Sequence, residues 1–255
     1  MRTLIPMAGA GSRFTEAGYT IPKPLLPILG EPMVINATKA LPESDNYTFI
    51  VRDFQISEYQ IDQHLKKYYP NADVIVLDHL TEGQAVTCLK AKEVFRADEE
   101  LLIGASDNGM IYDLKAFEKV KQDADALVFT FRNNPAVDAK PQAYGWVKLK
   151  GNSEVVERMS VKVPISSTPQ NDHAVVGAFW FKKADYFVKA AEHMIANNRR
   201  INNEFYVDEC INDLIELGYK VKVFEIDHYV CWGTPVDYQT FNYWSNYYDL
   251  ISKKL

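Results

Sequence analysis

The feature that most restricts the fold is an alternation of short apolar runs with helical patterns over residues 1–133. The helical patterns begin near Pro32, at about 55 and at Gln84, where Ala85, Cys88, Leu89 and Phe95 share one face. The apolar runs are typical of buried parallel strands and comprise "TLIPM" (3–7), "YTFIVR" (47–52), "DVIVLD" (73–78), "ELLIGAS" (100–106) and "ALVFTF" (126–131). This alternation predicts a βαβ sheet with helices on both faces.

The regular alternation of strands and helices ends after residue 133. The segment 143–162 has the pattern of a hairpin that turns at Gly151-Asn152, and "AVVGAFWF" (174–181) returns to the core. Helices are expected over about 184–195 and 207–217, followed by the strand "KVKVFEI". We therefore predict a Rossmann-like three-layer α/β/α domain with a mixed, mainly parallel sheet and an inserted antiparallel lobe. Residues 1–133, 134–232 and 233–255 would form its two halves and a C-terminal helix.

The C-terminal helix, expected over 236–252, has two apolar faces. One stripe contains Phe241, Trp244, Tyr248 and Ile251, and the opposite one contains Tyr243, Tyr247 and Leu250. A surface helix needs only one apolar face. Two explanations remain open: the helix is wedged between the body and another loop, or it forms an interface between subunits of a homo-oligomer.

Composition excludes several classes of function. The net charge of the 255 residues is −6, which argues against a nucleic-acid surface, because binding to phosphate backbones needs a basic field. The three cysteines have no paired spacing, which favours a reducing compartment over a disulfide framework. The longest apolar run, 174–181, is far shorter than the ~20 residues that span a bilayer. We expect a cytoplasmic protein with no membrane or nucleic-acid partner.

A glycine-rich stretch directly follows the first strand. Gly9 and Gly11 allow the backbone to turn tightly and to present its N–H groups to an anion. The stretch has neither the third glycine of a dinucleotide fingerprint nor a Walker sequence. Instead it carries two cations, Arg13 and Lys23, and Lys23 is stiffened by the prolines on both sides. Either cation alone could be a solvated surface group, but together they favour a phosphate site.

The sequence Gly9-x-Gly11-Ser12-Arg13 followed by Pro22-Lys23-Pro24-Leu25-Leu26-Pro27 closely resembles the signature of the sugar-phosphate nucleotidyltransferase family. The resemblance runs through most of the chain. Weaker matches follow in the family's order: Glu82-Gly83-Gln84-Ala85, Ser106-Asp107-Asn108, Tyr144-Gly145, Lys162, Asn203-Glu204-Phe205-Tyr206-Val207 and Trp232-Gly233-Thr234-Pro235. The resemblance implies attack by an acceptor phosphate on the α-phosphorus of a nucleoside triphosphate, with release of pyrophosphate.

The resemblance also implies roles for individual residues. Arg13 and Lys23 would be the catalytic cations, and no general base is needed because the nucleophile is already ionised. Gln84 could pair with a base edge, although a glutamine at a helix start can equally lie in solvent. The expected nucleotide-binding residues, in the half 1–133, are Ala8, Gly9, Ala10, Gly11, Ser12, Gly83 and Gln84.

Residues of the half 134–232 would bind the phosphorylated acceptor. Lys162 could contact the acceptor phosphate or could be the polar side of an alternating strand. Glu204 could accept hydrogen bonds from a hydroxyl or an ammonium group. Asp208 and Glu209 are expected to complement the N-terminus of the following helix. The acceptor-binding set is Tyr144, Gly145, Lys162, Glu204 and Tyr206.

A metal site is expected at Asp107, which follows the strand 100–106 where open α/β sheets bind ligands. Its carboxylate suits Mg²⁺, although Asp107-Asn108-Gly109 could also be a simple turn. The family's second aspartate aligns with Cys231, and a thiol is a poor Mg²⁺ ligand. Asp227 is the preferred replacement and Asp237 the other candidate.

Within the family, the sequence is most similar to the cytidylyltransferase-like branch. This resemblance implies CTP and phosphoglutamine as the expected substrates, or else a sugar 1-phosphate as acceptor, in the synthesis of capsule or surface-polysaccharide precursors. One alternative is a nucleotide-sugar-dependent glycosyltransferase, which would need an Asp-x-Asp motif where Asp107-Asn108-Gly109 stands. Another is a non-catalytic nucleotide-sensing subunit, which could tolerate Cys231.

Overall fold

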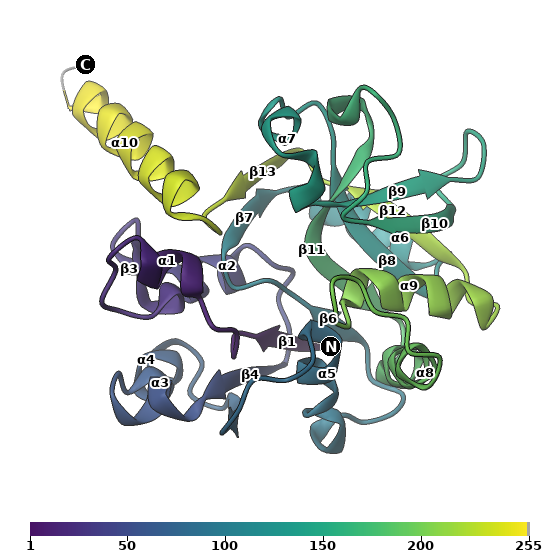
Figure 1. The fold of residues 1–255 in the computed structure, drawn as a ribbon, viewed down its shortest axis with the longest axis horizontal. Coiled ribbons are helices and arrows are strands. Elements are labelled where there is room, and N and C mark those ends of the chain that lie inside the picture. Colours follow the sequence, from purple (N-terminus) through teal and green to yellow (C-terminus); the bar gives the residue numbers. More distant parts are fainter. Residues whose placement is uncertain (254–255) are drawn as a thin grey trace.

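The computed structural model of the chain describes residues 1–253. Its main feature is a nine-stranded sheet (Figure 1). Seven of its strands lie side by side in the order β10-β9-β11-β6-β1-β4-β5, and the other two extend it from β11, with β8 beside β11 and β12 beside β8. The strands are β1 (Arg2–Pro6), β4 (Asn46–Arg52), β5 (Asp73–Leu77), β6 (Leu101–Ile103), β8 (Ala126–Phe131), β9 (Gly145–Leu149), β10 (Val156–Val161), β11 (His173–Phe181) and β12 (Val221–Glu225). The predicted mixed α/β class is confirmed.

The first half supplies the parallel strands. β1 lies between β4 and β6 and is parallel to both, and β5 is parallel to β4. Each of these strands coincides with an apolar run of the sequence. The prediction that 73–78 is a buried strand was wrong, because β5 forms the outer edge and Val76 is 48% exposed. Its β-branched residues specify a strand, but they do not specify its place in the sheet.

The antiparallel strand β11 joins the two halves of the chain. It pairs with β6 of the first half, with β9 of the hairpin and with β8 on its other edge. A register shift between Val175 and Phe179 surrounds Gly177, whose φ of 94° favours glycine. The predicted hairpin is confirmed as β9 and β10, with Gly151 in its turn.

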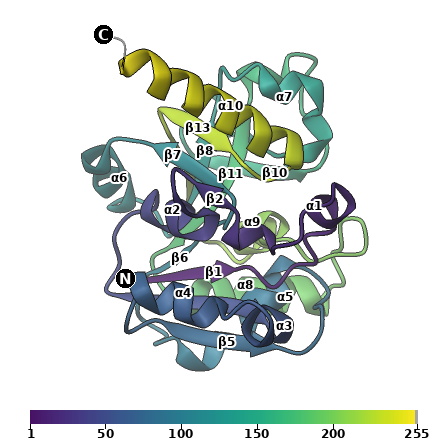
Figure 2. The same ribbon diagram turned by 90° about the vertical axis from the view of Figure 1, so that its left-hand side faces the viewer.

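Helices cover both faces of the sheet (Figures 1 and 2). One core cluster contains Leu4 of β1 with residues of α5, α8 and α9, and the other contains Ile5 with residues of α2, α4 and α6. The longer helices are α2 (Met33–Lys39), α4 (Ile61–Tyr68), α6 (Leu114–Lys121), α8 (Ala184–Ala196), α9 (Val207–Glu216) and α10 (Pro235–Ser252). The shorter ones are α1 (Ser12–Glu16), α3 (Asp53–Ser57), α5 (Gln84–Leu89) and α7 (Ala136–Ala139).

Some expected helices differ in length. The single helix expected over 55–68 is two helices, α3 and α4, because Gln60 has a left-handed φ of 50° between them. α5 ends at Leu89, so Phe95 lies beyond it. α6 was not predicted. Neither were two small sheets, one made of β7 (Asn108–Ile111) and β13 (His228–Cys231) and one made of β2 (Pro27–Ile28) and β3 (Glu31–Pro32).

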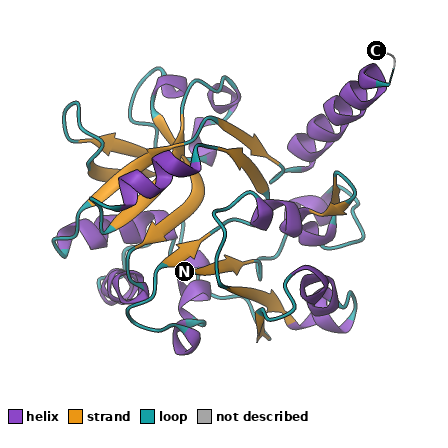
Figure 3. Cartoon of the chain, turned by 180° about the vertical axis from the view of Figure 1, so that it is seen from behind, coloured by secondary structure: helices purple, strands orange, loops and turns teal. Residues whose placement is uncertain are grey.

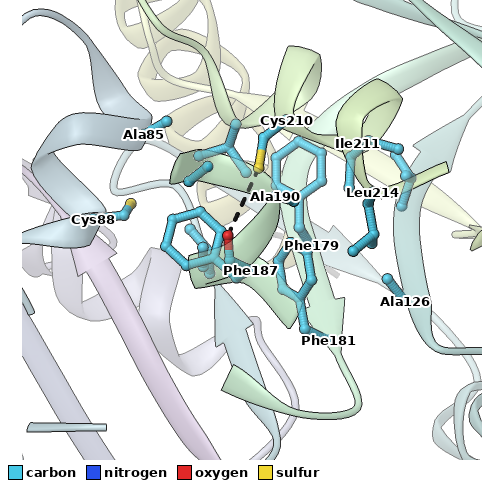
Figure 4. Packing of buried hydrophobic residues seen from close by; sticks show 14 of the residues in the cluster. Ala85, Cys88, Ala126, Phe179, Phe181, Phe187, Ala190, Cys210, Ile211 and Leu214 are labelled. Carbon is cyan, nitrogen blue, oxygen red and sulfur yellow. Dashed lines mark hydrogen bonds between the residues drawn. The ribbon is translucent and has the colours of Figure 1, made fainter. Parts of the chain in front are cut away.

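Two of the three cysteines are part of the hydrophobic core. Cys88 of α5 and Cys210 of α9 are fully buried, and the Cys210 thiol points toward the carbonyl oxygen of Phe187 (Figure 4). Cys231 lies apart from them, half-buried at the end of β13. All three are free thiols. This arrangement agrees with the expectation from the sequence that they form no disulfide framework.

The C-terminal helix α10 projects from the body (Figures 1 and 3). Tyr238 is buried and Phe241 packs on Trp232, whereas Trp244 and Tyr248 remain 49% and 65% exposed. The helix is therefore not wedged between the body and a loop of the same chain. Among the described residues, no helix combines the length and apolarity needed to cross a membrane.

Candidate active site

The glycine loop connects β1 to α1 at the carboxyl end of a central parallel strand. Gly11 caps α1 in the left-handed conformation, with φ 62°. Gly9 and Ala10 are exposed, and Arg13 projects from the first turn of α1. The loop backbone is therefore open to a ligand, as an anion-binding turn requires.

Lys23 contacts Asp107 across the site. Pro22 holds an extended ψ of 140° and starts a short 3₁₀ helix, η1 (Lys23–Leu25), so that the Lys23 ammonium donates to Asp107 Oδ2 over 2.7 Å. Burial alone would raise the pKa of Asp107, but the charge and hydrogen bond of Lys23, aided by Arg13, lower it overall. The Asp107 carboxyl is thus ionised at neutral pH, and both side chains keep some exposure to solvent.

Two cavities adjoin the glycine loop. The larger one, of about 540 Å³, is lined by the loop, Lys23, Ser106 and residues of α3. The smaller one, of about 290 Å³, lies between Ala8–Ala10 and the segment that contains Gly83 and Gln84. Gly9 and Ala10 line both cavities, so the loop separates two adjacent spaces at one edge of the sheet. Open α/β sheets bind their ligands at this edge.

The segment around Gly83 is tied to the second half of the chain. Phe205 N donates to Glu82 O over 2.8 Å, and Ala85 N donates to Phe205 O over 2.9 Å. Gly83 has φ 128°, and a Cβ there would lie 2.5 Å from the Phe205 backbone. Gln84 begins α5 and is half-buried beside the smaller cavity. The resemblance did not predict this close backbone approach.

Tyr144, Lys162 and Tyr206 lie together in the second half. Lys162 has a left-handed φ of 63°, its N donates to Tyr144 O, and its Nζ donates to Ala143 O over 2.6 Å. The same ammonium lies 5.5 Å from the centre of the Tyr206 ring. Burial lowers the pKa of Lys162, nearby Arg13 lowers it further, and Asp208 and Glu204 oppose the shift. Lys162 is therefore close to charged groups of both halves.

Glu204 lies at the boundary between the two expected subsites. It lines the smaller cavity together with Gly83 and Gln84, although the resemblance assigned it to the acceptor. Burial raises the pKa of Tyr206 to about 12, and the charge and hydrogen bond of Glu204 add to this shift. The Glu204 carboxylate is therefore within reach of groups expected to bind nucleotide and of groups expected to bind acceptor.

The two carboxylates expected to share a metal are not brought together. β13 pairs with β7 so that Cys231 lies opposite Asn108 and His228 opposite Ile111. Asp227 precedes β13, and its N donates to Ile111 O at the far end of β7. Its side chain lines another cavity, together with Arg132 and His228. Four residues of strand, roughly 13 Å, separate it from Cys231. The choice of Asp227 as a ligand beside Asp107 is thus corrected: it lies at the far end of the ladder.

Cys231 and Asp237 occupy the place where a second carboxylate was sought. Cys231 Sγ lies 3.5 Å from Asp237 Oδ2 and accepts from Gly233 N, and a Cβ at Gly233 would lie 3.0 Å from Asp107 Oδ2. Burial, with the charge of Asp107 next, raises the pKa of Cys231 to about 12. Cys231 is therefore a neutral thiol, while Asp237 also accepts from Thr234.

Asp107, Cys231 and Asp237 together fit a divalent cation that takes most of its ligands from water and from substrate phosphates. Asp107 supplies one ionised carboxylate in contact with Lys23, which lines the larger cavity. The neutral thiol of Cys231 is a poor ligand for a hard cation. Mg²⁺ keeps several waters and bridges phosphate oxygens, so one or two protein carboxylates are enough to hold it. Asp107 would be the residue to hold such a cation, and Asp237, which lies beside Cys231, would be the nearer of the two candidate partners.

Comparison with known proteins identifies the family. The family model described as nucleotidyl transferase matches residues 2–245. The chain belongs to this family and is a nucleotidyltransferase. Enzymes of the family typically use a divalent metal. No curated protein matches the sequence significantly.

Solved structures share the fold. A nucleoside-diphosphate-sugar pyrophosphorylase from Vibrio cholerae RC9 is 23% identical, with TM-score 0.75, over 94% of this chain and 98% of its own. The inositol-1-phosphate CTP transferase from T. maritima is 12% identical, with TM-score 0.73, over 94% and 93%. A UDP-glucose pyrophosphorylase in complex with UDP-glucose is 18% identical, with TM-score 0.68, over 96% and 98%.

Proposed function

We propose that the protein transfers a nucleotidyl group from a nucleoside triphosphate to a small phosphorylated acceptor and releases pyrophosphate. The observation that carries this proposal is the pair of Lys23 and Asp107, 2.7 Å apart, beside an open glycine loop with Arg13 at its end. Both substrates are anions, so catalysis depends on positioning them and on neutralising their charge. Fixed cations and loop amides beside two cavities supply both effects.

In the proposed reaction an acceptor phosphate oxygen attacks the α-phosphorus, and the bond from the α-phosphorus to the bridging oxygen of the β-phosphate breaks. The electron pair of that bond leaves with pyrophosphate. Arg13 and the amides of residues 8–12 bind the β- and γ-phosphates and stabilise the leaving group. Lys23 neutralises the α-phosphate and the incoming oxygen. Mg²⁺, held by Asp107, would add Lewis-acid stabilisation of the phosphate charge.

CTP is the proposed donor and phosphoglutamine the proposed acceptor, with a sugar 1-phosphate as the alternative. Resemblance to enzymes of capsule and surface-polysaccharide synthesis supports this choice, and Gln84 offers the donor and acceptor atoms that a pyrimidine edge needs. Tyr144, Gly145, Lys162, Glu204 and Tyr206 would line the acceptor side. The proposed location is the cytoplasm, which agrees with three free cysteines.

One experiment tests the reaction. The four nucleoside triphosphates are each combined with sugar 1-phosphates, phosphocholine and phosphorylated amino acids, and pyrophosphate release is measured with and without Mg²⁺. We expect Mg²⁺-dependent release that requires both substrates and is fastest with CTP. Release of nucleoside diphosphate from a nucleotide sugar would instead support the glycosyltransferase alternative. Nucleotide binding without turnover would support the sensing subunit, although the family assignment favours an enzyme.

The partner proposed for α10 is a second copy of the chain. Its exposed aromatic side chains Tyr243, Trp244, Tyr247 and Tyr248 form one cluster on the projecting part of the helix. Between Pro235 and Tyr248 the only charged residue is Asp237, so two copies would meet without charge repulsion. Sedimentation of the protein and of a variant that ends at Asn242 tests this: a dimer that becomes a monomer supports it, and equal monomer masses oppose it.

A further inference from the structure

The segment that carries Arg13 packs on a hydrophobic cluster separate from the two larger cores. The buried members of this third cluster come from the first half and from the C-terminal segment, and are Phe14, Leu26, Ile28, Met33, Ala37, Trp232 and Tyr238. Tyr19 and Phe241 pack against them. The base of α10, residues 235–241, therefore lies against α1 and the turn that follows it (Figure 1).

Tyr238 contacts this segment through its ring. The centre of the ring lies 6.2 Å from that of Phe14 and 5.8 Å from that of Tyr19. The rings of Phe14 and Tyr19 are themselves 5.3 Å apart, and all three pairs meet edge to face. Aromatic pairs with this geometry attract each other beyond the effect of burial. Tyr238 thus contacts the chain directly after Arg13 and again at the end of the turn.

Two hydrogen bonds give this packing a direction. The Tyr238 hydroxyl donates to Pro27 O over 3.2 Å, and Gln239 Nε2 donates to the Tyr19 hydroxyl over 3.2 Å. Within the segment, Tyr19 N donates to Phe14 O over 3.0 Å. The position of Tyr19 is therefore transmitted to α1, whose first turn carries the arginine.

The same segment forms a wall of the larger cavity. Phe14 and Tyr19 line this cavity together with the glycine loop and Lys23. Phe14 is buried and Tyr19 is half-buried, but residues 12, 13 and 15–18 are exposed. On another side, the Tyr59 hydroxyl adds one hydrogen bond to Thr20 O over 2.9 Å. Because an exposed segment is held through its buried side chains, Phe14 and Tyr19 are the anchors that locate Arg13.

We propose that Tyr238 and Gln239, at the base of α10, are positioning residues for the triphosphate. Through their contacts with Phe14 and Tyr19 they hold the Arg13 guanidinium where the β- and γ-phosphates bind. The inference rests on the proposed function and makes the C-terminal helix part of the nucleotide site. Both residues act through the α1 segment and not by touching phosphate.

The test separates positioning from simple core packing. Tyr238→Leu removes the ring but leaves an apolar side chain, whereas Tyr238→Phe keeps the ring and removes only the hydroxyl. Gln239→Ala changes an exposed residue and so leaves the core intact. The matched control is Phe117→Leu, because Phe117 is also a buried aromatic residue but packs on Phe129 and Phe224 in another cluster. Thermal unfolding checks that each variant is folded.

Inorganic tripolyphosphate is the probe, because it binds through phosphate contacts alone, and calorimetry measures its affinity. Tyr238→Leu should weaken binding about tenfold, as expected from the loss of two aromatic pairs. Gln239→Ala should weaken it about threefold, as expected from the loss of one hydrogen bond. Tyr238→Phe and Phe117→Leu should bind nearly as tightly as the wild type, although Phe117→Leu unfolds at a lower temperature. In the pyrophosphate assay, the KM of the nucleotide should rise in Tyr238→Leu while that of the acceptor stays constant.

Hydrogen exchange tests the position of the segment without any ligand. Tyr238→Leu should speed exchange of the backbone amides of residues 14–19 by about tenfold, and Phe117→Leu should leave them unchanged. Equal weakening of tripolyphosphate binding by these two variants would overturn the inference, as would wild-type exchange or wild-type affinity in Tyr238→Leu. If Tyr238→Leu does not fold, Gln239→Ala decides by the same two measurements. If the wild type binds neither tripolyphosphate nor CTP, the proposed function itself fails, and exchange alone decides whether α10 holds the segment.

Discussion

At the scale of single residues, the central feature is the placement of charge before any substrate binds. Lys23 and Asp107 come from segments 84 residues apart, and their contact fixes the positions of both. Arg13 lowers the pKa of Asp107 and of Lys162, so it lies within electrostatic range of both. The site thus has its cations assembled in advance, which is how charge stabilisation becomes effective in catalysis.

Replacing the cations should reduce turnover without unfolding the protein. Lys23→Ala and Arg13→Ala should each lower kcat by about 10²–10³-fold, the usual effect of removing one group that stabilises developing negative charge. Pyrophosphate release at saturating substrates measures this. Arg13→Ala should change the free energy of unfolding little, because Arg13 is exposed. Lys23→Ala should lower it by about 1–3 kcal/mol, because it leaves the mostly buried Asp107 carboxylate without its partner. The control is Lys39→Ala, which removes a cation paired with Glu31 that lines neither of the two cavities beside the glycine loop. Near-normal rates in both site variants would contradict the assigned roles.

Asp107 and Asp227 should differ sharply in their effect on metal use. The pKa of Asp107 is lower in the folded protein than the value of about 3.9 in an unfolded chain. Its ionised form therefore stabilises the folded state at pH values above about 3.9. This stabilisation is lost as the pH falls through the folded-state pKa. The carboxylate is therefore charged throughout neutral assays. Asp107→Asn should remove the response of the rate to Mg²⁺, and Asp227→Asn should leave the Mg²⁺ titration unchanged. The opposite pattern would restore Asp227 as the ligand.

The sequence could predict which charged residues lie at the site, but not all of their neighbours. Arg13 and Lys23 belong to one short signature, so residues close in the sequence are also close in the fold. The position of Asp227 depends on the register of β13 against β7. No strand was expected over 108–111, where a turn was the alternative to a metal site because Asn and Gly are typical of turns. Asp208 was read from its helix position alone, since its contact with Gly145 joins segments 63 residues apart.

At the scale of elements, the contact that matters most joins the α5 segment to the segment before α9. Phe205 exchanges backbone hydrogen bonds with Glu82 and Ala85, and Arg200 of the same segment forms an ion pair with Glu82. The expected base-contacting segment and the expected acceptor side are therefore one continuous structure. A disturbance at Gly83 should reach both subsites.

Gly83→Ala should test this junction. The added Cβ meets the Phe205 backbone at 2.5 Å in a conformation, φ 128°, that alanine avoids, so we expect a loss of about 2–3 kcal/mol in the free energy of unfolding. The KM values for nucleotide and acceptor should rise together. Gly151→Ala is the control: it has φ 55° but no neighbour within 4 Å, and should cost about 1 kcal/mol without kinetic effect. Equal destabilisation by the two substitutions would contradict the junction.

The elements were predicted best where the pattern is long and periodic. β4, β8, β11, α8 and α9 match their expected ranges closely. The failures are short or lie at edges: β5 looks buried from its composition, and the break at Gln60 has no glycine or proline to announce it. Such features are set by contacts with the rest of the fold and not by local propensity.

At the scale of the whole molecule, the two halves form one sheet and share their cores. Each of the two larger core clusters contains residues from 1–133 and from 134–232, such as Leu4 with Phe179 and Ile5 with Trp180. β11 links the halves through its pairing with β6 and β9. This sharing supports the proposed organisation as a single domain.

A single domain should unfold in one step. In a urea titration, Trp fluorescence reports on residues beyond 133, because all four tryptophans lie there and three of them, Trp146, Trp180 and Trp232, are buried. Far-UV circular dichroism reports on the helices of both halves. The two midpoints should coincide, because neither half keeps a complete core without the other. Two separate transitions, or a fragment 1–133 that folds alone, would contradict the prediction.

The central claim is that the glycine loop, Arg13 and Lys23 hold the triphosphate for cleavage. The most direct test is a crystal structure with a CTP analogue whose α–β bridge cannot be hydrolysed. We predict the β- and γ-phosphates within hydrogen-bonding distance of the amides of residues 9–12 and of Arg13, with Lys23 at the α-phosphate. Phosphates bound away from this loop, with Lys23 still paired to Asp107, would contradict the account.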